Sequence, residues 1–229
     1  MVQQTRRRLV YGRRQGHKLR GRQAGLMETL LPSLRISCSC AGDLDPQTLF
    51  DFPVKEVWLE IGFGGAEHLL EQARAHPEIG FIGCEPFING VAKLLAGIET
   101  HGLRNIRVHD GDARDVLESL ESRSLGRMFL LFPDPWHKKR HNKRRFVSNE
   151  NLDQMARLLK PGGVLRIASD IPDYIRWTLV HIYAHGGFTW QARMARDWRF
   201  RPADWPATRY EAKALRQGRR PSYLTFLRR

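Results

Sequence analysis

The feature that most constrains the fold is a regular alternation of short apolar, β-rich runs with helical segments from about residue 54 onward. Strands are predicted over 54–61, 79–84, 105–108, 128–132 and 164–168, and helices over 66–75, 88–101, 149–159 and 172–184. Two further strands are predicted over 188–194 and 223–227. Strands that alternate with helices in this way predict an α/β fold with a doubly wound, mostly parallel sheet.

The predicted strands end in glycines or acids. These residues are Gly62–Gly65, Glu85, Asp112, Asp134 and Asp170, and Glu60 lies inside the first strand. Ligands of open α/β sheets bind beyond the carboxyl ends of the strands. We therefore expect these side chains to surround one site, although each acid alone is also what a helix cap or a turn would use.

The glycine turn after the first strand, Glu60-Ile-Gly62-Phe-Gly64-Gly65, lets a ligand approach the backbone closely because glycine has no Cβ. A dinucleotide fingerprint would have a third glycine where this chain has Glu67. Two acids around a pyrophosphate are unfavourable, whereas S-adenosylmethionine (AdoMet) carries an ammonium and a sulfonium and no phosphate. The turn therefore favours AdoMet over a nicotinamide cofactor, with Glu85 placed for the ribose hydroxyls and Asp112 for the adenine amino group.

The fourth strand ends in Pro133-Asp134-Pro135-Trp136, and cations follow almost at once. They are Lys138, Lys139, Arg140, Lys143, Arg144 and Arg145. An acid between two prolines is held stiffly, and a cluster of cations beyond it suits the phosphates of a nucleic acid. Trp136 or His137 could stack on a base, although Trp136 would serve equally well as a packing residue.

The net charge points to a polyanionic partner. The chain carries 38 Lys and Arg against 24 Asp and Glu, a formal +14. Residues 1–25 contain eight of these cations and no acid. We interpret 1–50 as a basic, flexible N-terminal arm for RNA or DNA and 51–229 as the folded domain, with an anionic membrane surface as the second candidate partner.

The cysteines and the pattern of apolar residues argue against a disulfide-rich, zinc-binding, secreted or membrane-spanning protein. Cys38, Cys40 and Cys84 are too few for a disulfide framework, and no second pair completes a zinc site beside Cys38 and Cys40. We expect reduced thiols, no metal and a cytoplasmic protein, since neither a signal peptide nor a membrane-spanning run is present.

A set of motifs occurs in a fixed order: Glu60-Ile-Gly-Phe-Gly, Glu85, Asp112-Ala113, the Pro-Asp134-Pro-Trp segment with its basic tail, Ser169-Asp170 and Thr208-Arg-Tyr-Glu211. Together they resemble the tRNA (guanine-N7-)-methyltransferase family, of the Rossmann-like class I AdoMet-dependent fold, in its bacterial single-chain type. The resemblance covers about 50–229 and rests mainly on the Pro-Asp-Pro-Trp segment.

The resemblance implies a reaction and its residues. AdoMet would methylate N7 of a guanosine in the variable loop of tRNA, with contacts from Glu60, Gly62, Gly64, Glu85, Asp112 and Asp134, the last being catalytic. Substrate contacts would fall on Lys138, Asp170, Thr208, Arg209, Tyr210 and Glu211. Arg140, Lys143, Arg144 and Arg145 would contact RNA phosphates. No membrane and no obligatory protein partner is expected, and the choice between monomer and homodimer stays open.

Chemistry supports this reaction without excluding its rivals. Guanine N7 is an unprotonated lone pair at neutral pH, so its methylation needs alignment and charge stabilisation and not a base. Methyltransferases of exocyclic amines carry a second proline after the acid, which is absent from Asp134-Pro135-Trp136. A methyltransferase for another target atom and an RNA-binding module without activity are the alternatives.

Overall fold

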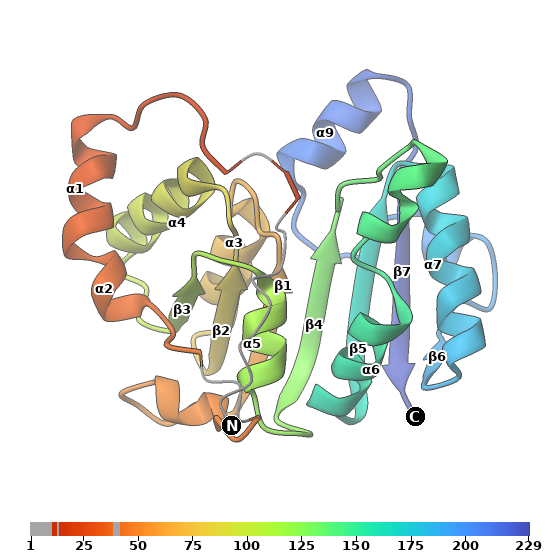
Figure 1. Cartoon of the computed structure of the whole chain (residues 1–229), viewed down its shortest axis with the longest axis horizontal. Helices are drawn as coiled ribbons and strands as arrows, with labels where there is room; N and C mark the ends of the chain where they lie inside the picture. Colours follow the sequence, from red (N-terminus) through yellow and green to blue (C-terminus); the bar gives the residue numbers. More distant parts are fainter. Residues whose placement is uncertain (1–10, 13, 39–41) are drawn as a thin grey trace.

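The computed structural model describes residues 11, 12, 14–38 and 42–229, which build a seven-stranded sheet in the order β3-β2-β1-β4-β5-β7-β6 (Figure 1). The strands are β1 (Glu56–Ile61), β2 (Ile79–Cys84), β3 (Ile106–His109), β4 (Leu125–Leu131), β5 (Leu159–Ser169), β6 (Phe188–Trp190) and β7 (Ser222–Arg228). Strands β1 to β5 run parallel to one another, and β7 runs antiparallel to its neighbours β5 and β6. The prediction of an α/β, mostly parallel, doubly wound sheet is confirmed.

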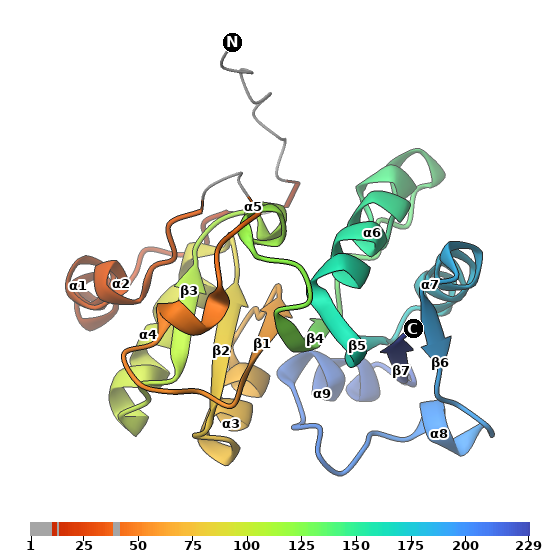
Figure 2. The same cartoon turned by 90° about the horizontal axis from the view of Figure 1, so that it is seen from below.

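Helices cover both faces of the sheet (Figure 2). They are α1 (Gly21–Thr29), α2 (Leu31–Leu34), α3 (Glu67–Ala75), α4 (Ile88–His101), α5 (Ala113–Ser119), α6 (Asn149–Leu158), α7 (Pro172–His185), α8 (Arg196–Arg199) and α9 (Arg209–Arg216), with 3-10 helices η1 (Pro46–Leu49) and η2 (Lys139–Arg144). Helices α5, α6 and α7 lie on one face, and α3 and α4 on the other. Helices on both sides of the sheet bury both faces of its parallel strands.

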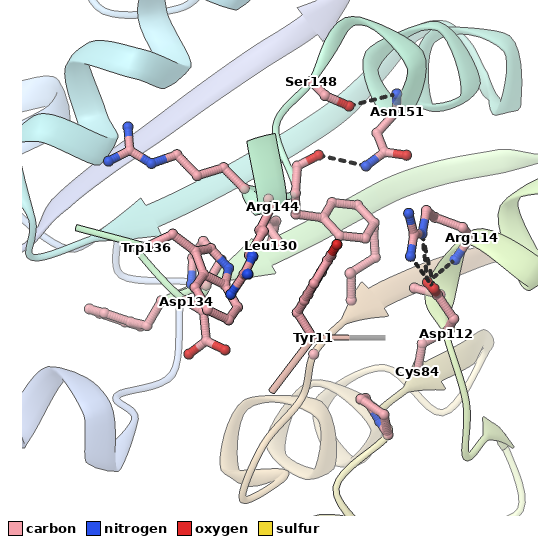
Figure 3. A pocket seen from close by; sticks show the side chains of 18 of the residues that line it. Tyr11, Cys84, Asp112, Arg114, Leu130, Asp134, Trp136, Arg144, Ser148 and Asn151 are labelled. Atoms are coloured by element: carbon pink, nitrogen blue, oxygen red, sulfur yellow. Dashed lines mark hydrogen bonds and ion pairs between the residues drawn. The ribbon is translucent and has the colours of Figure 1, made fainter. Parts of the chain in front are cut away.

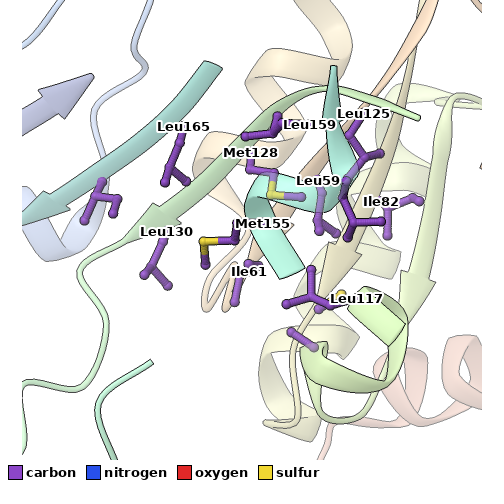
Figure 4. Close-up of a cluster of buried hydrophobic side chains, with 14 of the residues drawn as sticks. Leu59, Ile61, Ile82, Leu117, Leu125, Met128, Leu130, Met155, Leu159 and Leu165 are labelled. Carbon is purple, nitrogen blue, oxygen red and sulfur yellow. The ribbon is translucent and has the colours of Figure 1, made fainter. Parts of the chain in front are cut away.

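Each face of the sheet has its own apolar core. Residues that alternate along β1 divide between the two cores, with Leu59 and Ile61 on the side of α5–α7 and Trp58 on the side of α3 and α4. Met128 and Met155 fill the first of these cores between the sheet and α6 (Figure 4). Both faces of the central strands are thus covered, which leaves their carboxyl ends as the place for a site.

Several element boundaries differ from the sequence predictions. Helix α5 was not predicted, and it begins where the Asp112 side chain accepts a hydrogen bond from Arg114 N. Strand β6 ends at Trp190, short of the predicted residue 194, and the Asp197 carboxylate binds the backbone N–H groups of Arg193 and Met194 in the turn that follows. Local caps of this kind stop or start an element independently of hydrophobic periodicity.

Part of the segment predicted as a flexible arm is packed structure. Leu26, Leu31 and Leu34 of α1 and α2 are buried in the core beside α4. Ile36 N donates to Val108 O, so the segment also covers the free edge of β3. The flexible-arm prediction over 1–50 is therefore wrong for α1 and α2, because their leucines complete one core, and residues 1–10 lie outside the described residues.

Two expected absences concern membranes and metals. Within the described residues, no helix is long and apolar enough to cross a membrane, and no three His, Cys, Asp or Glu side chains gather in a way that could hold a metal ion. Cys40, which the sequence analysis paired with Cys38, lies outside the described residues.

Candidate functional site

A cavity of about 730 Å³ opens at the carboxyl ends of β1, β2 and β4, where the strand order reverses. Gly62, Gly64, Glu85, Asp112 and Asp134 all line it. Five predicted cofactor residues from four separate chain segments thus meet in one place. The volume lies in the usual range for small-molecule sites, about 300–1,000 Å³.

The glycine turn needs its glycines for conformation and for space. Gly62 and Gly64 have φ angles of +71° and +53°, the left-handed region in which a Cβ is strained. A Cβ on Gly64 would lie 2.9 Å from the Tyr210 ring, whereas a Cβ on Gly62 would meet no atom within 4 Å. The turn therefore presents bare backbone at Gly62 toward the cavity, the geometry that a close-packed ligand requires.

Glu85 is a buried carboxylate at the end of β2. Its oxygens accept hydrogen bonds from Gly64 N at 2.7 Å and Phe87 N at 2.9 Å. Burial raises the pKa of the Glu85 carboxyl, the two backbone N–H groups oppose that shift, and nearby Asp134 and Glu60 add to it. Glu85 therefore links the glycine turn to the start of α4. Its ionised form is a negative charge on the cavity wall, and burial makes that charge energetically unfavourable.

Asp112 lines the cavity from the N-terminus of α5. Its carboxylate accepts from Arg114 N at 3.0 Å and pairs with the Arg114 guanidinium at 2.5 Å (Figure 3). The Asp112 carboxylate therefore caps α5, holds Arg114 beside the cavity and lines the space that a ligand would occupy.

Glu60, in contrast, does not line the cavity. Its side chain points to the core of α3, where His68 Nδ1 lies 2.7 Å from Glu60 Oε2 and both residues are almost fully buried. The structure separates this predicted cofactor residue from the other five, because alternate residues of β1 face opposite sides of the sheet.

The catalytic candidate Asp134 lies at the mouth of the cavity between two strained residues. Phe132 and Trp136 have φ angles of +50° and +46°, which non-glycine residues rarely adopt. The Asp134 carboxylate makes no hydrogen bond to a described residue, and its surroundings withdraw enough water to raise its pKa. An unpaired carboxylate on a stiff, strained support is available to a ligand.

The basic run after Trp136 divides into two kinds of residue. Lys138, just before η2, and Arg140, within it, are exposed, and Lys143, Arg144 and Arg145 line the cavity. Arg145 is 3% exposed. Its guanidinium donates to Pro135 O at 2.9 Å and pairs with Asp173 at 2.5 Å. Arg145 is therefore not available to a phosphate, contrary to the sequence prediction, and instead supports the backbone beside Asp134.

Tyr11 is a cavity residue that sequence reasoning missed. The Arg144 guanidinium lies 4.4 Å from the Tyr11 ring centroid and 5.1 Å from that of Trp136 (Figure 3). The following segment is anchored on α4, where Ile88 N donates to Arg14 O and Gly16 N to the Asn89 side chain. The chain before α1 thus crosses the cavity mouth, and no motif marks Tyr11 because its partners are far away in sequence.

Of the predicted substrate residues in and beside α9, only some line the cavity. Tyr210 lines the cavity and stacks on Phe132 with centroids 6.5 Å apart. Thr208 caps α9, and the Glu211 carboxylate accepts from Tyr223 and pairs with Arg201. Within the described residues the structure therefore brings Tyr210 to the cavity and gives Thr208 and Glu211 supporting contacts.

Arg209 and Asp170 lie beside the cavity and do not line it. Arg209 pairs with Glu67 at the start of α3, 3.5 Å away. Asp170 follows β5 and pairs with Arg219 at 2.5 Å.

The N-terminus of α6 supplies further lining of the cavity that was not predicted, including Ser148 and Asn151. These two carry only the signal of a helix cap in the sequence.

This strand order, with an acid-lined cavity at the reversal point, defines the class I methyltransferase fold. The chain is similar to the solved 16S rRNA methyltransferase KamB, with a TM-score of 0.56 and 17% identity over 80% of this chain and 90% of the other. It is also similar to precorrin-6y C5,15-methyltransferase from Geobacter metallireducens GS-15, with a TM-score of 0.51 and 15% identity over 90% and 88% of the two chains. These likenesses concern the fold alone.

Sequence comparison identifies the family. A family model described as "Putative methyltransferase" matches residues 54–223. A tRNA (guanine-N(7)-)-methyltransferase of Rhodospirillum rubrum is 53% identical over 96% of this chain and 87% of the relative. One of Mesorhizobium japonicum is 52% identical over 96% and 94%. The chain belongs to the tRNA (guanine-N7-)-methyltransferase family, as the resemblance predicted.

Proposed function

We propose that this protein transfers the methyl group of AdoMet to N7 of a guanosine in the variable loop of tRNA. The observation that carries the proposal is the Asp134 carboxylate at the mouth of an acid-lined cavity, which pairs with no residue that the structure describes and has Lys143 and Arg144 beside it. The acids suit a cationic donor, and the cations suit a polyanionic acceptor.

The residues present fit AdoMet. The open backbone at Gly62 leaves room for a closely packed ligand, and Glu85 and Asp112 offer carboxylate oxygens to hydroxyl and amino groups. The cofactor supplies an electrophilic methyl group on a positively charged sulfur. Glu85 would hold the ribose and Asp112 the adenine side. Glu60 does not line the cavity, so it would not contact AdoMet directly. It would support the end of β1 through its contact with His68.

The chain's task in the reaction is alignment and charge stabilisation. Guanine N7 uses its in-plane lone pair, so no proton leaves that atom. A new N–C bond forms as the S–C bond breaks, and the positive charge moves to the guanine. Asp134, fixed between Pro133 and Pro135, would accept a hydrogen bond from the guanine N–H edge or from the donor's amine and offset the moving charge. It is not required as a proton acceptor.

RNA binding would use the cations at and beyond the cavity mouth. Lys138, just before η2, and Arg140, within it, are exposed, and Lys143 and Arg144 border the cavity. Phosphate contacts position a substrate without choosing its base. Trp136 and Tyr210, which both line the cavity, are the aromatic surfaces on which the target base could stack.

The experiment is methyl transfer from labelled AdoMet to unmodified tRNA transcripts, followed by chemical cleavage at N7-methylguanosine. Cleavage at a single variable-loop guanosine is expected. Label without cleavage would assign another target atom, and tRNA binding without label would favour an RNA-binding module. Either result would refute the proposed function.

A further inference from the structure

A second cavity, of about 430 Å³, lies on the far side of α7 from the first. Its walls come from α7, through Ile175, Leu179 and Val180, and from Trp198 of α8. The hydroxyl groups of Ser169 and Ser222 and the carboxylate of Asp170 stand at the strand ends that close it. It is thus a mostly apolar slot with one aromatic wall and a few polar groups along one edge.

Arginines surround this slot. Arg176 and Arg220 line it directly, and Arg219 is held beside it by Asp170. The Arg176 side chain is 77% exposed, with Asp173 3.6 Å away. Arg220 is exposed and forms no ion pair with any residue that the structure describes. Cations therefore outnumber carboxylates at the mouth, which gives the slot an attraction for phosphate groups.

The slot lies at the same edge of the sheet as Asp134. Asp134 follows β4, Asp170 follows β5, and these two strands are hydrogen-bonded neighbours. Adjacent strands are about 4.8 Å apart, so the two strand ends are close enough for one RNA molecule to reach both sites. Helix α7 separates them, with His181 on the wall of the first cavity and Leu179 and Val180 on the wall of the second.

We propose that this second cavity binds an unstacked nucleotide of the same tRNA whose guanosine enters the first cavity. The base would lie between the apolar face of α7 and Trp198, Asp170 would accept from a base N–H or a ribose hydroxyl, and Arg176 and Arg220 would contact the flanking phosphates. An apolar slot with an aromatic wall and a cationic rim is the combination that single-stranded RNA favours. The inference rests on the proposed function and adds a second recognition site to it.

The test uses full-length variants and an unmodified tRNA transcript. Val180→Trp fills the slot from an exposed position without removing a core contact, since Val180 is 59% exposed. Trp198→Ala removes the aromatic wall, and Arg220→Ala removes one cation. Each should raise the KM for tRNA while kcat at saturating tRNA and the affinity for AdoMet stay unchanged. The rise expected for Trp198→Ala, which removes the aromatic wall, and for Val180→Trp, which excludes the base from the slot, is about tenfold, the scale of one lost base–aromatic stack.

Two control variants match these changes. Tyr183→Ala alters a 90% exposed aromatic residue of the same helix that does not line the slot, and Lys55→Ala removes one exposed cation at the opposite edge of the sheet. Both should leave the KM for tRNA unchanged. Direct tRNA binding, measured in parallel, should weaken by the same factor as the KM rises.

Two results would overturn the inference. One is an unchanged tRNA KM and affinity in Val180→Trp. The other is a wild-type dimer, measured by light scattering, that Val180→Trp converts to a monomer without altering tRNA affinity, since the slot would then receive a second copy of the chain. Failure of the proposed function is separate, because it would show as absent N7 methylation by the wild-type protein.

Discussion

Replacing Arg145 by alanine should damage both stability and turnover without altering phosphate binding. Arg145 is buried, and its guanidinium donates to Pro135 O and lies 5.0 Å from the Trp177 ring centroid. A charged hydrogen bond of this kind contributes about 1.5–3 kcal/mol, and the ring contact about 1 kcal/mol. The ion pair with Asp173 adds less than about 1 kcal/mol, because Asp173 is more than half exposed. We expect Arg145→Ala to lower the free energy of unfolding by about 3 kcal/mol.

The loss of turnover follows from what Arg145 supports. Its contact with Pro135 O braces the backbone next to Asp134, between the left-handed Phe132 and Trp136. Without that contact the strained segment can relax and move the carboxylate. kcat should therefore fall, whereas the slope of log affinity for tRNA against log salt concentration should stay at its wild-type value.

The measurements are urea unfolding, single-turnover methyl transfer and tRNA binding at several salt concentrations. Arg140→Ala is the matched control, since Arg140 is an exposed arginine of the same run. It should change the unfolding free energy by less than about 0.5 kcal/mol. It should also make the slope of log affinity against log salt concentration less steep, by nearly the amount that one phosphate contact contributes. If Arg145→Ala flattened the salt slope and left stability unchanged, the assignment of Arg145 to support would be refuted.

Three further predictions follow from the site. Asp134→Asn should lower kcat by about a hundredfold, the scale of one lost preorganised charge contact, while AdoMet still binds; near-normal turnover would contradict the role of Asp134. Tyr11→Ala should weaken AdoMet binding about fivefold by removing the ring over Arg144, with the melting temperature unchanged, and calorimetric titration with Tyr11→Phe as the control would measure this. Because the pKa values of Glu85 and Asp134 are raised, both carboxyls take up protons at higher pH than ordinary acids, and a cationic ligand lowers those pKa values again. AdoMet binding in acidic solution should therefore release protons, measured as a dependence of the binding enthalpy on the buffer, and the release should fade as the pH rises through the raised pKa values.

Much of the fold could be predicted from sequence periodicity alone. Strand β2 and helix α4 have the predicted bounds, since continuous apolar runs and a clear helical face leave little freedom. The same argument placed Gly62, Glu85, Asp112 and Asp134 at strand ends, and parallel strands bring those ends to one edge. The convergence of these residues on one cavity is therefore a consequence of local pattern plus topology.

The orientation of single side chains was not predictable in this way. Arg145 sits in a run of exposed cations, and only the packing of η2 against α7 reveals that it is buried beside Tyr174 and Trp177. Glu60 belongs to the motif of the glycine turn, yet the pleat of β1 turns it toward His68. Tyr11 reaches Arg144 from more than a hundred positions away in the chain.

The sequence by itself determined the class of fold, the carboxyl-edge site and the acid–base contrast between the cofactor side and the RNA side. These properties depend on hydrophobic periodicity, turn residues and charge, which are local quantities. The tertiary structure alone decided which cations are free for phosphates, which acids face the cavity, and that a second slot lies behind α7. These properties depend on burial and on contacts between distant segments, and no local pattern encodes them.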